Sequence, residues 1–334
     1  MHSRVKKKDD RFLFNQKDRE QLKADLAEEN FKRRTCSFYR YILIDDPQVL
    51  RDELYKDWFD LRILGRVYIA AEGINAQISV PEPHWDQFLE TLNSRVVLAK
   101  IPLKHAVQEG QSFLKLAIRV KQEIVAYNIS ANEYDMSHVG EHLNAAEFNE
   151  AMDNPDSIVV DMRNYYESEV GRFKTAITPD VETSRELLPQ VKHLLKGQEE
   201  KEVLLYCTGG IRCEKASSYL LEKGFKDVYQ LKGGILKYLE QNTKKNSRFK
   251  GECFVFDERV SVNKKLKNGR YQQCYACRMP ISKDDISSIH YKKGISCPHC
   301  FSKTSKRQKN RFAERQNQIN LSFLKNIDHF SSQT

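Results

Sequence analysis

Hydrophobic positions in residues 35–127 alternate between two spacings. Short runs rich in β-branched and aromatic residues predict strands, and longer runs with apolar residues at helical spacing predict helices. In chain order these segments are a strand at 36–44, a helix at 48–61, strands at 65–71 and 74–80, a helix at 81–95 and a strand at 113–127. The order βαββαβ predicts a ferredoxin-like α+β domain at residues 35–127. A charged extension, residues 1–34, precedes it and contains a predicted helix around 16–31.

The pattern of residues 128–242 differs, because short apolar strands alternate with helices. Strands are predicted at 157–163, 201–206 and 227–231, with a helix start at 140–148 and a helix at 213–223. This alternation is typical of an α/β domain with a parallel sheet. Residues 243–334 are polar and basic, with a cluster of cysteines and a predicted basic helix at 306–334. We therefore expect an α/β multidomain protein with a basic C-terminal segment.

The composition allows several cores and excludes some classes of protein. Apolar residues make up 40% of the 334 residues, which is enough for two or three domains. No run approaches the roughly 20 apolar residues that span a bilayer. The positive N-terminus is not followed by the apolar segment of a secretory signal. We expect a cytoplasmic protein without a membrane partner, and the sequence carries no signal for an oligomeric state.

The positive charge of the chain is concentrated at its C-terminal end. Residues 243–334 contain 20 Lys/Arg and 7 Asp/Glu, whereas residues 1–242 have a balance of −4. A basic segment on a nearly neutral body indicates a polyanionic partner. A solvated tail without any partner is the alternative that charge alone leaves open.

The segment Cys207-Thr208-Gly209-Gly210-Ile211-Arg212 follows a predicted buried strand and precedes a helix. Ligands of open α/β sheets bind at such a position. The backbone N–H groups of the helix start, with the Arg212 charge, would stabilise a thiolate or the terminal sulfur of a persulfide on Cys207. We predict Cys207 and Arg212 as catalytic. The predicted substrate-binding residues are Thr208, Gly209, Gly210 and Ile211. A buried, inert cysteine before an ordinary turn is the alternative.

Residues 128–242 resemble a rhodanese domain. The resemblance rests on Asp161-Met162-Arg163, Glu167, the segment 171–176 and the closing motif 224–234. Arg172 stands where that family often has His. The C-x4-R spacing is one residue shorter than the C-x5-R loop of related phosphatases, so a single sulfur fits better than a phosphate. Cys213 is either a resolving thiol for Cys207 or a packed, structural cysteine.

The whole chain is similar to the bacterial tRNA uridine hydroxylases. The segments that carry this similarity are 70–76, 207–216 and 251–260. The resemblance implies an acylphosphatase-like N-terminal domain, tRNA bound by its anticodon loop, and oxygen-dependent 5-hydroxylation of the wobble uridine, position 34. The chain itself shows no flavin or nucleotide fingerprint, haem motif or 2-His-1-carboxylate spacing. Segment 70–76 is either a hairpin turn with Gly73 at positive φ or an RNA contact.

Two Cys-x-x-Cys pairs lie 19 residues apart, Cys274/Cys277 and Cys297/Cys300. This spacing is typical of a zinc ribbon, in which four thiolates bind one structural Zn²⁺. Four reduced cysteines without a metal are the alternative.

Three functions are compatible with these features. The first is a tRNA-modifying enzyme that uses Cys207. The second is a sulfurtransferase that passes persulfide sulfur to an acceptor, and the third is a non-catalytic RNA-binding adaptor. The intact cysteine loop disfavours the adaptor, and the basic C-terminal region disfavours a sulfurtransferase for small molecules.

Overall fold

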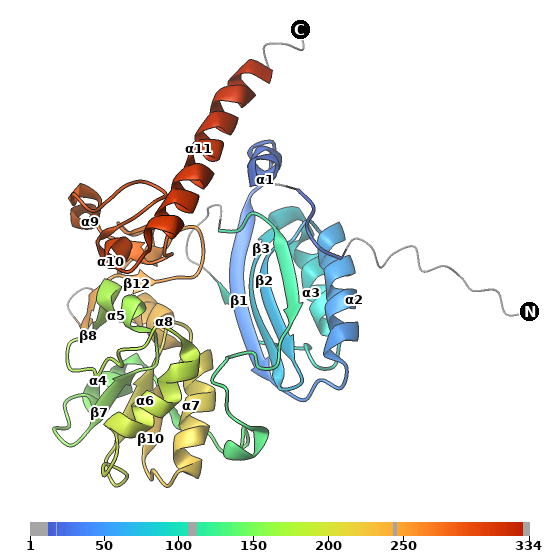
Figure 1. Ribbon diagram of the computed structural model, residues 1–334. Coiled ribbons are helices and arrows are strands. Elements are labelled where there is room, and N and C mark those ends of the chain that lie inside the picture. The colour runs from blue at the N-terminus through green and yellow to red at the C-terminus, as the bar shows by residue number, and fades with distance from the viewer. Residues whose placement is uncertain (1–12, 18, 106–111, 243–245, 330–334) are drawn as a thin grey trace, which may run out of the picture.

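The structure, a computed structural model, describes residues 13–17, 19–105, 112–242 and 246–329. Figure 1 shows an N-terminal α+β domain, a central α/β domain and a C-terminal unit that continues into a long helix. The predicted fold class is confirmed. Among the described residues, no helix is long and apolar enough to cross a membrane.

The N-terminal domain contains the predicted βαββαβ order. Its elements are β1 (Arg33–Tyr41), α2 (Pro47–Asp60), β2 (Leu64–Ala70), β3 (Gly73–Pro81), a 3-10 turn (Glu82–His84), α3 (Trp85–Asn93), β4 (Lys104–His105) and β5 (Leu116–Val120), preceded by α1 (Arg19–Ala27). The sheet order is β4-β1-β3-β2-β5. The strand expected at 113–127 is shorter, and it pairs parallel with β2 at one edge. The position beside β1 is taken by β4, which the sequence pattern did not predict.

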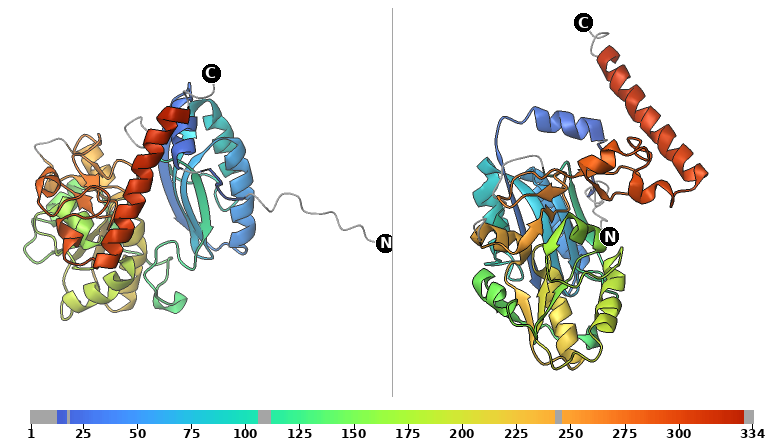
Figure 2. Two further views of the ribbon diagram at one scale, coloured as in Figure 1. Left: turned by 45° about the horizontal axis from the view of Figure 1, so that its top comes forward. Right: turned by 90° about the vertical axis from the view of Figure 1, so that its left-hand side faces the viewer.

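One face of this sheet packs on α2 and α3, and the other faces the central domain (Figure 2). The alternation along β1 produces this division, because successive side chains point to opposite faces. Phe38 is buried against Trp58 under the helices. Tyr39 and Tyr41, on the other face, contact the central domain. Asp46 fixes the start of α2 by accepting N–H groups from Gln48 and Val49 at 3.0 Å.

The central domain contains a parallel sheet in the order β6-β10-β9-β7. Its elements are β6 (Glu141–Leu143), α4 (Ala145–Ala151), β7 (Ile158–Asp161), α5 (Tyr165–Val170), β8 (Gly171–Phe173), α6 (Ser184–Leu194), β9 (Val203–Tyr206), α7 (Ile211–Glu222), β10 (Val228–Leu231) and α8 (Gly234–Gln241). The helix start expected at 140–148 was placed too early, because residues 141–143 form an edge strand. Asn144 then caps α4.

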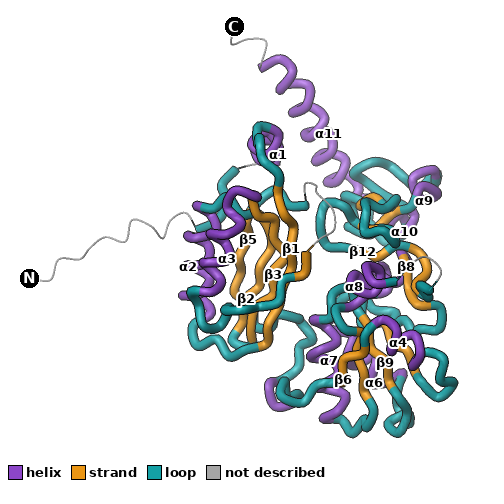
Figure 3. The backbone as a smooth tube through the Cα atoms, turned by 180° about the vertical axis from the view of Figure 1, so that it is seen from behind, coloured by secondary structure: helices purple, strands orange, loops and turns teal. Residues whose placement is uncertain are grey.

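The C-terminal segment begins inside the central domain. Strand β11 (Phe249–Gly251) pairs antiparallel with β8, and Phe249 is fully buried against Phe173. The chain continues through β12 (Cys253–Phe254), β13 (Ser261–Val262), β14 (Gln272–Gln273), β15 (Pro280–Ile281), α9 (Lys283–Ser287) and α10 (Pro298–Phe301). Helix α11 (Lys306–His329) then extends away from this unit (Figure 3). Five buried residues of this stretch therefore belong to the core of the α/β domain: Phe249, Cys253, Val255, Val262 and Leu266.

Candidate functional site

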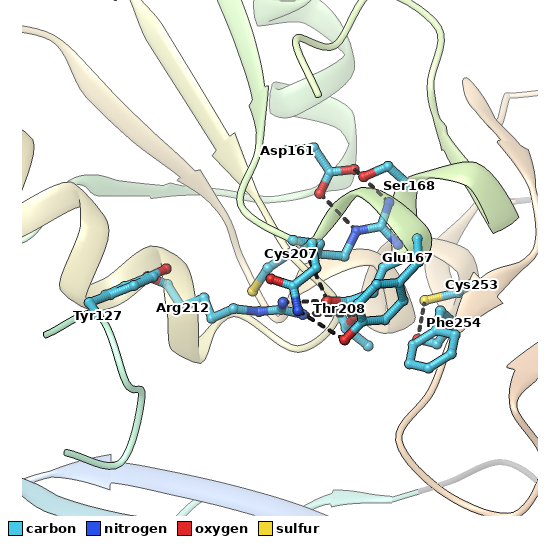
Figure 4. A network of polar contacts seen from close by, with 12 residues as sticks. Tyr127, Asp161, Glu167, Ser168, Cys207, Thr208, Arg212, Cys253 and Phe254 are labelled. Atoms are coloured by element: carbon cyan, nitrogen blue, oxygen red, sulfur yellow. Dashed lines mark hydrogen bonds and ion pairs between the residues drawn. The ribbon is translucent and has the colours of Figure 1, made fainter. Parts of the chain in front are cut away.

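Cys207 lies directly after β9, at the carboxyl end of the parallel sheet (Figure 4). Its side chain is fully buried. The Cys207 sulfur accepts the backbone N–H of Gly210 at 3.1 Å. Gly210 has φ of 100°, a left-handed conformation that favours glycine, and α7 begins at the next residue. The loop thus directs at least one backbone N–H group at the sulfur, as the sequence pattern indicated.

Helix α8 fixes the opposite side of the same loop. The N–H groups of Ile235 and Leu236 donate to the carbonyls of Cys207 and Thr208 at 2.9 and 3.2 Å. A Cβ atom at Gly234 would lie 2.6 Å from the Cys207 carbonyl oxygen. Only glycine therefore fits this contact, which explains Gly234 of the closing motif.

The surroundings of Cys207 favour the thiolate. Burial raises the pKa of this thiol, but the Cys213 thiol, the Arg212 guanidinium and the Gly210 N–H together outweigh burial and lower its pKa to about 5. The pKa of Cys213 is instead raised well above its usual range, by burial and by the charge on Cys207. Cys213 therefore remains a neutral donor beside a charged sulfur.

Arg212 does not present a free charge to the site. Its guanidinium donates two hydrogen bonds to the Glu167 carboxylate, at 2.7 and 2.8 Å. Glu167, on α5, is fully buried, and Thr208 lies beside the pair, 3.4 Å from Arg212. This bidentate pair holds the first turn of α7 against α5.

A second buried ion pair, between Asp161 and Arg163, lies in the same domain. Asp161 accepts two hydrogen bonds from Arg163, at 2.8 and 2.6 Å, and one each from Ser168 and Tyr206. Arg163 also donates to the carbonyl of Gly171. The Asp161-Met162-Arg163 motif therefore fixes the end of β7 and the start of β8, whereas Glu167 fixes Arg212.

The N-terminal domain contacts the loop with three residues that the sequence pattern did not single out. Lys104 on β4 donates to the carbonyl of Gly209. Tyr39 lies beneath the Lys104 ammonium and donates to Glu214 at 3.0 Å. Tyr41 donates to the carbonyl of Ile211 at 3.2 Å. The alternation of β1 was the sequence signal for the two tyrosines, because it places both away from the domain's own core, whereas no pattern indicated Lys104.

Segment 70–76 is a β-hairpin turn, as one of the two interpretations expected. Gly73 has φ of 146°, and a Cβ there would lie 2.1 Å from the Arg40 carbonyl oxygen. The Glu72 carboxylate accepts hydrogen bonds from Lys215 and Tyr134, each at 2.7 Å. Lys215 is fully buried and also donates to Glu123 at 2.7 Å. Glu72 therefore ties the N-terminal domain to α7.

The four cysteines of the C-terminal unit come together. The sulfurs of Cys274, Cys277, Cys297 and Cys300 all lie within 4.8 Å of one another. Two of the sulfur pairs are 3.7 Å apart. Four thiolates in a tetrahedron around zinc, each about 2.3 Å from the ion, lie about 3.8 Å from one another. The donor set and its spacing fit a four-thiolate metal site.

The geometry of Cys207 leads to a prediction for its titration. The thiolate absorbance of the wild type minus that of Cys207→Ser should appear with a midpoint near pH 5. The sign follows from the lowered pKa, since the thiolate forms above the pKa and is lost as pH falls below it. Ultraviolet difference titration measures this directly. A midpoint in the range of an ordinary cysteine, about 8.5, would contradict a stabilised thiolate at this position.

Two family models match separate parts of the chain. Residues 33–124 match the UPF0176 acylphosphatase like domain, and residues 144–241 match the rhodanese-like domain. The rhodanese-like domain of a protein from Anabaena sp. is 16% identical, covers 33% of this chain and 78% of its own, and gives a TM-score of 0.27. A single-domain sulfurtransferase from Saccharomyces cerevisiae is 17% identical, covers 32% of this chain and 94% of its own, with a TM-score of 0.27.

A relative from Leptospira interrogans matches much more of the chain. It is named tRNA uridine(34) hydroxylase and is 47% identical over 297 residues, which cover 87% of this chain and 80% of the relative. The match extends beyond either domain alone. This chain therefore belongs to the tRNA uridine(34) hydroxylase family.

Proposed function

We propose that this protein hydroxylates uridine 34 of tRNA and that Cys207 is its nucleophile. The observation that supports this most is the Cys207 sulfur, which is buried, accepts the Gly210 N–H and has a pKa lowered to about 5. A thiol in this state is nucleophilic at neutral pH. The Leptospira relative supports the choice of substrate.

The loop suits a sulfur atom carried on Cys207. We propose that the Cys207 thiolate takes the sulfane sulfur of a donor such as thiosulfate, which leaves as sulfite, and that the resulting persulfide is the intermediate. Molecular oxygen is the proposed co-substrate: one of its atoms enters the base, and the other leaves as water with electrons from an external reductant. The proposed binding residues for the second sulfur and the base are Thr208, Gly209, Gly210 and Ile211, which follow Cys207 in the loop. A Cβ added at Gly209 would meet nothing within 4 Å, so the loop is open beside this residue. Arg212 acts together with Glu167 to hold the loop and to favour the anionic sulfur.

The basic C-terminal region is the proposed phosphate-binding surface, together with the N-terminal domain. A base must leave its stack before it is modified, and an anticodon loop already exposes its bases. Lys265 and Lys267 are exposed on the turn after β13, next to Lys264. The tRNA substrate is consistent with the expected cytoplasmic location.

The rhodanese domain also favours a second candidate, transfer of persulfide sulfur to an acceptor. That function requires Cys207 but no tRNA. Turnover of thiosulfate and cyanide without any change in tRNA nucleosides would identify it. If neither activity is found, the remaining candidate is a non-catalytic RNA-binding adaptor.

The four-cysteine cluster is the proposed site of a structural Zn²⁺. A bound zinc ion would supply a rigid crosslink for a unit that has few buried apolar side chains. The cluster lies next to α5, because Met279 contacts the Tyr165 hydroxyl at 3.9 Å. The same helix contains Glu167, which binds Arg212 of the Cys207 loop.

Purified protein should contain about one zinc per chain. Cys274→Ser should lower the zinc content and destabilise the unit after residue 270, while the thermal transition of the α/β core changes little. Cys36→Ser, at a buried cysteine of the N-terminal domain, is the control. Elemental analysis of protein prepared without chelator gives the content. Four freely titrating thiols at Cys274, Cys277, Cys297 and Cys300 would contradict the site.

Cys207→Ser should abolish formation of 5-hydroxyuridine in purified tRNA, because a hydroxyl cannot carry a persulfide. Cys213→Ser should keep a substantial fraction of the activity, because the Ser hydroxyl can still donate a hydrogen bond to the Cys207 sulfur. Arg212→Ala should lower the rate roughly 10–1,000-fold, as deletion of one electrostatic group does at other sites. Nucleoside mass spectrometry measures the product. Equal loss in both cysteine variants would favour a two-thiol mechanism.

Replacement of Lys264, Lys265 and Lys267 by Glu should weaken tRNA binding. The slope of log affinity against log salt should become less steep by roughly 0.9 for each phosphate that the variant no longer neutralises. Lys192, Lys196 and Lys201, exposed on the central domain, provide a control with the same charge change. The affinity of each triple variant for tRNA, measured over a series of salt concentrations, shows whether the two variants differ. Equal effects of both triple variants, or binding that does not depend on salt, would contradict this surface.

A further inference from the structure

The loop that contains Cys207 is covered on one side by a lysine from another domain. Lys104 lies on β4, the short strand beside β1, and its ammonium donates to the Gly209 carbonyl. The same ammonium lies 4.4 Å from the centre of the Tyr39 ring. A Cβ atom added at Gly210 would be 3.7 Å from the Lys104 nitrogen. The positive charge therefore binds Gly209 and lies close to Gly210, whose N–H group donates to the Cys207 sulfur.

This charge is not neutralised in the way that the Arg212 charge is. Arg212 shares two hydrogen bonds with the buried Glu167 carboxylate. The ion pairs found within the described ranges include none for Lys104, whose hydrogen bond goes to a neutral carbonyl. The Glu214 carboxylate nearby already accepts Tyr39, His142 and Gln230, at 3.0, 2.9 and 3.1 Å. Lys104 thus brings a positive charge to the loop that is close to the Glu214 carboxylate but forms no ion pair with it among the described residues.

The domain interface keeps Lys104 in this position. Tyr41 donates to the Ile211 carbonyl at 3.2 Å. Next to it, at the end of β1 where Tyr41 pairs with Gly73, Glu72 accepts a hydrogen bond from Lys215 of α7, which also binds Glu123, at 2.7 Å from each carboxylate. These contacts fix the N-terminal sheet, with β4 beside β1, on α7.

We propose that Lys104 is a positioning residue of the active site, and that its charge, contributed by the acylphosphatase-like domain, stabilises the Cys207 thiolate. This inference rests on the proposed role of Cys207 as the nucleophile. It gives the N-terminal domain a part in the chemistry beyond any contact with RNA. Burial lowers the pKa of Lys104, and the charges of Cys207 and Glu214 oppose that effect, as expected for an ammonium near an anionic sulfur.

Three substitutions separate the charge of Lys104 from its hydrogen bond. Lys104→Met removes both, Lys104→Gln keeps a donor for the Gly209 carbonyl without charge, and Lys104→Arg keeps both. Each variant is made with and without Cys207→Ser, so that the difference in thiolate absorbance reports Cys207 alone. Lys115→Met, at an exposed lysine of the same domain, is the matched control.

The midpoint of the Cys207 titration should rise by roughly one pH unit in Lys104→Met and Lys104→Gln, the lower end of the shift that a nearby opposite charge gives. It should stay near the wild-type value in Lys104→Arg and Lys115→Met. The other groups that face the sulfur remain in every variant. They are Cys213, Arg212 and Glu214 on α7, Glu167 on α5, Tyr127 before the central domain and Tyr39 on β1.

A wild-type midpoint in Lys104→Gln would overturn the proposal, because it would show that the charge of Lys104 does not affect the titration of Cys207. The same holds if Lys104→Arg shifts the midpoint as much as Lys104→Gln does. Near-ultraviolet circular dichroism of each variant checks the fold, and the Gln and Arg variants decide the question even where Met disturbs packing. The assay contains no tRNA, so its outcome is independent of whether the protein hydroxylates uridine.

Discussion

An anionic sulfur in a fully buried position is the constraint on which the other features of the site rest. Burial is the largest influence on the pKa of the Cys207 thiol, and by itself it would keep the thiol uncharged. The charge persists only where fixed dipoles and positive groups replace water. The Gly210 N–H and the Cys213 thiol provide this directly. The carbonyls of the loop must then point elsewhere, and α8 stabilises two of them by donating hydrogen bonds.

The same constraint explains why the Cys207 loop contacts both domains. A loop of six residues cannot by itself fix the direction of its carbonyls or the position of its buried arginine, and the lysine beside it belongs to another domain. Groups outside the loop therefore have to position all three. Glu167 on α5 positions Arg212, and β4 of the N-terminal domain positions Lys104. Lys215 is buried between Glu72 and Glu123, and removal of one partner from a buried ion pair typically costs about 3–5 kcal/mol. These contacts therefore hold the two domains together at the Cys207 loop.

The sequence allowed prediction of features that depend on neighbouring residues. The strand before Cys207, the glycines that follow it and the spacing of the four cysteines are local, so pattern alone located them. Contacts between distant segments were not predictable in this way. Lys104 and Gly209 are 105 positions apart, and Glu72 and Lys215 are 143 apart. Arg212 was expected to act as a fixed charge, and only the structure shows that Glu167 compensates it. The pairing of β11 with β8 was missed for the same reason, since polar, charged residues surround Phe249 in the sequence.

Whether this buried thiolate acts on tRNA is tested most directly by nucleoside mass spectrometry of tRNA from cells that lack this protein. We expect 5-hydroxyuridine derivatives at position 34 to disappear in those cells. The wild-type chain should restore them, whereas the Cys207→Ser chain should not. An unchanged level of these nucleosides in the deletion strain, or full restoration by the Cys207→Ser chain, would contradict the role of Cys207 in this modification.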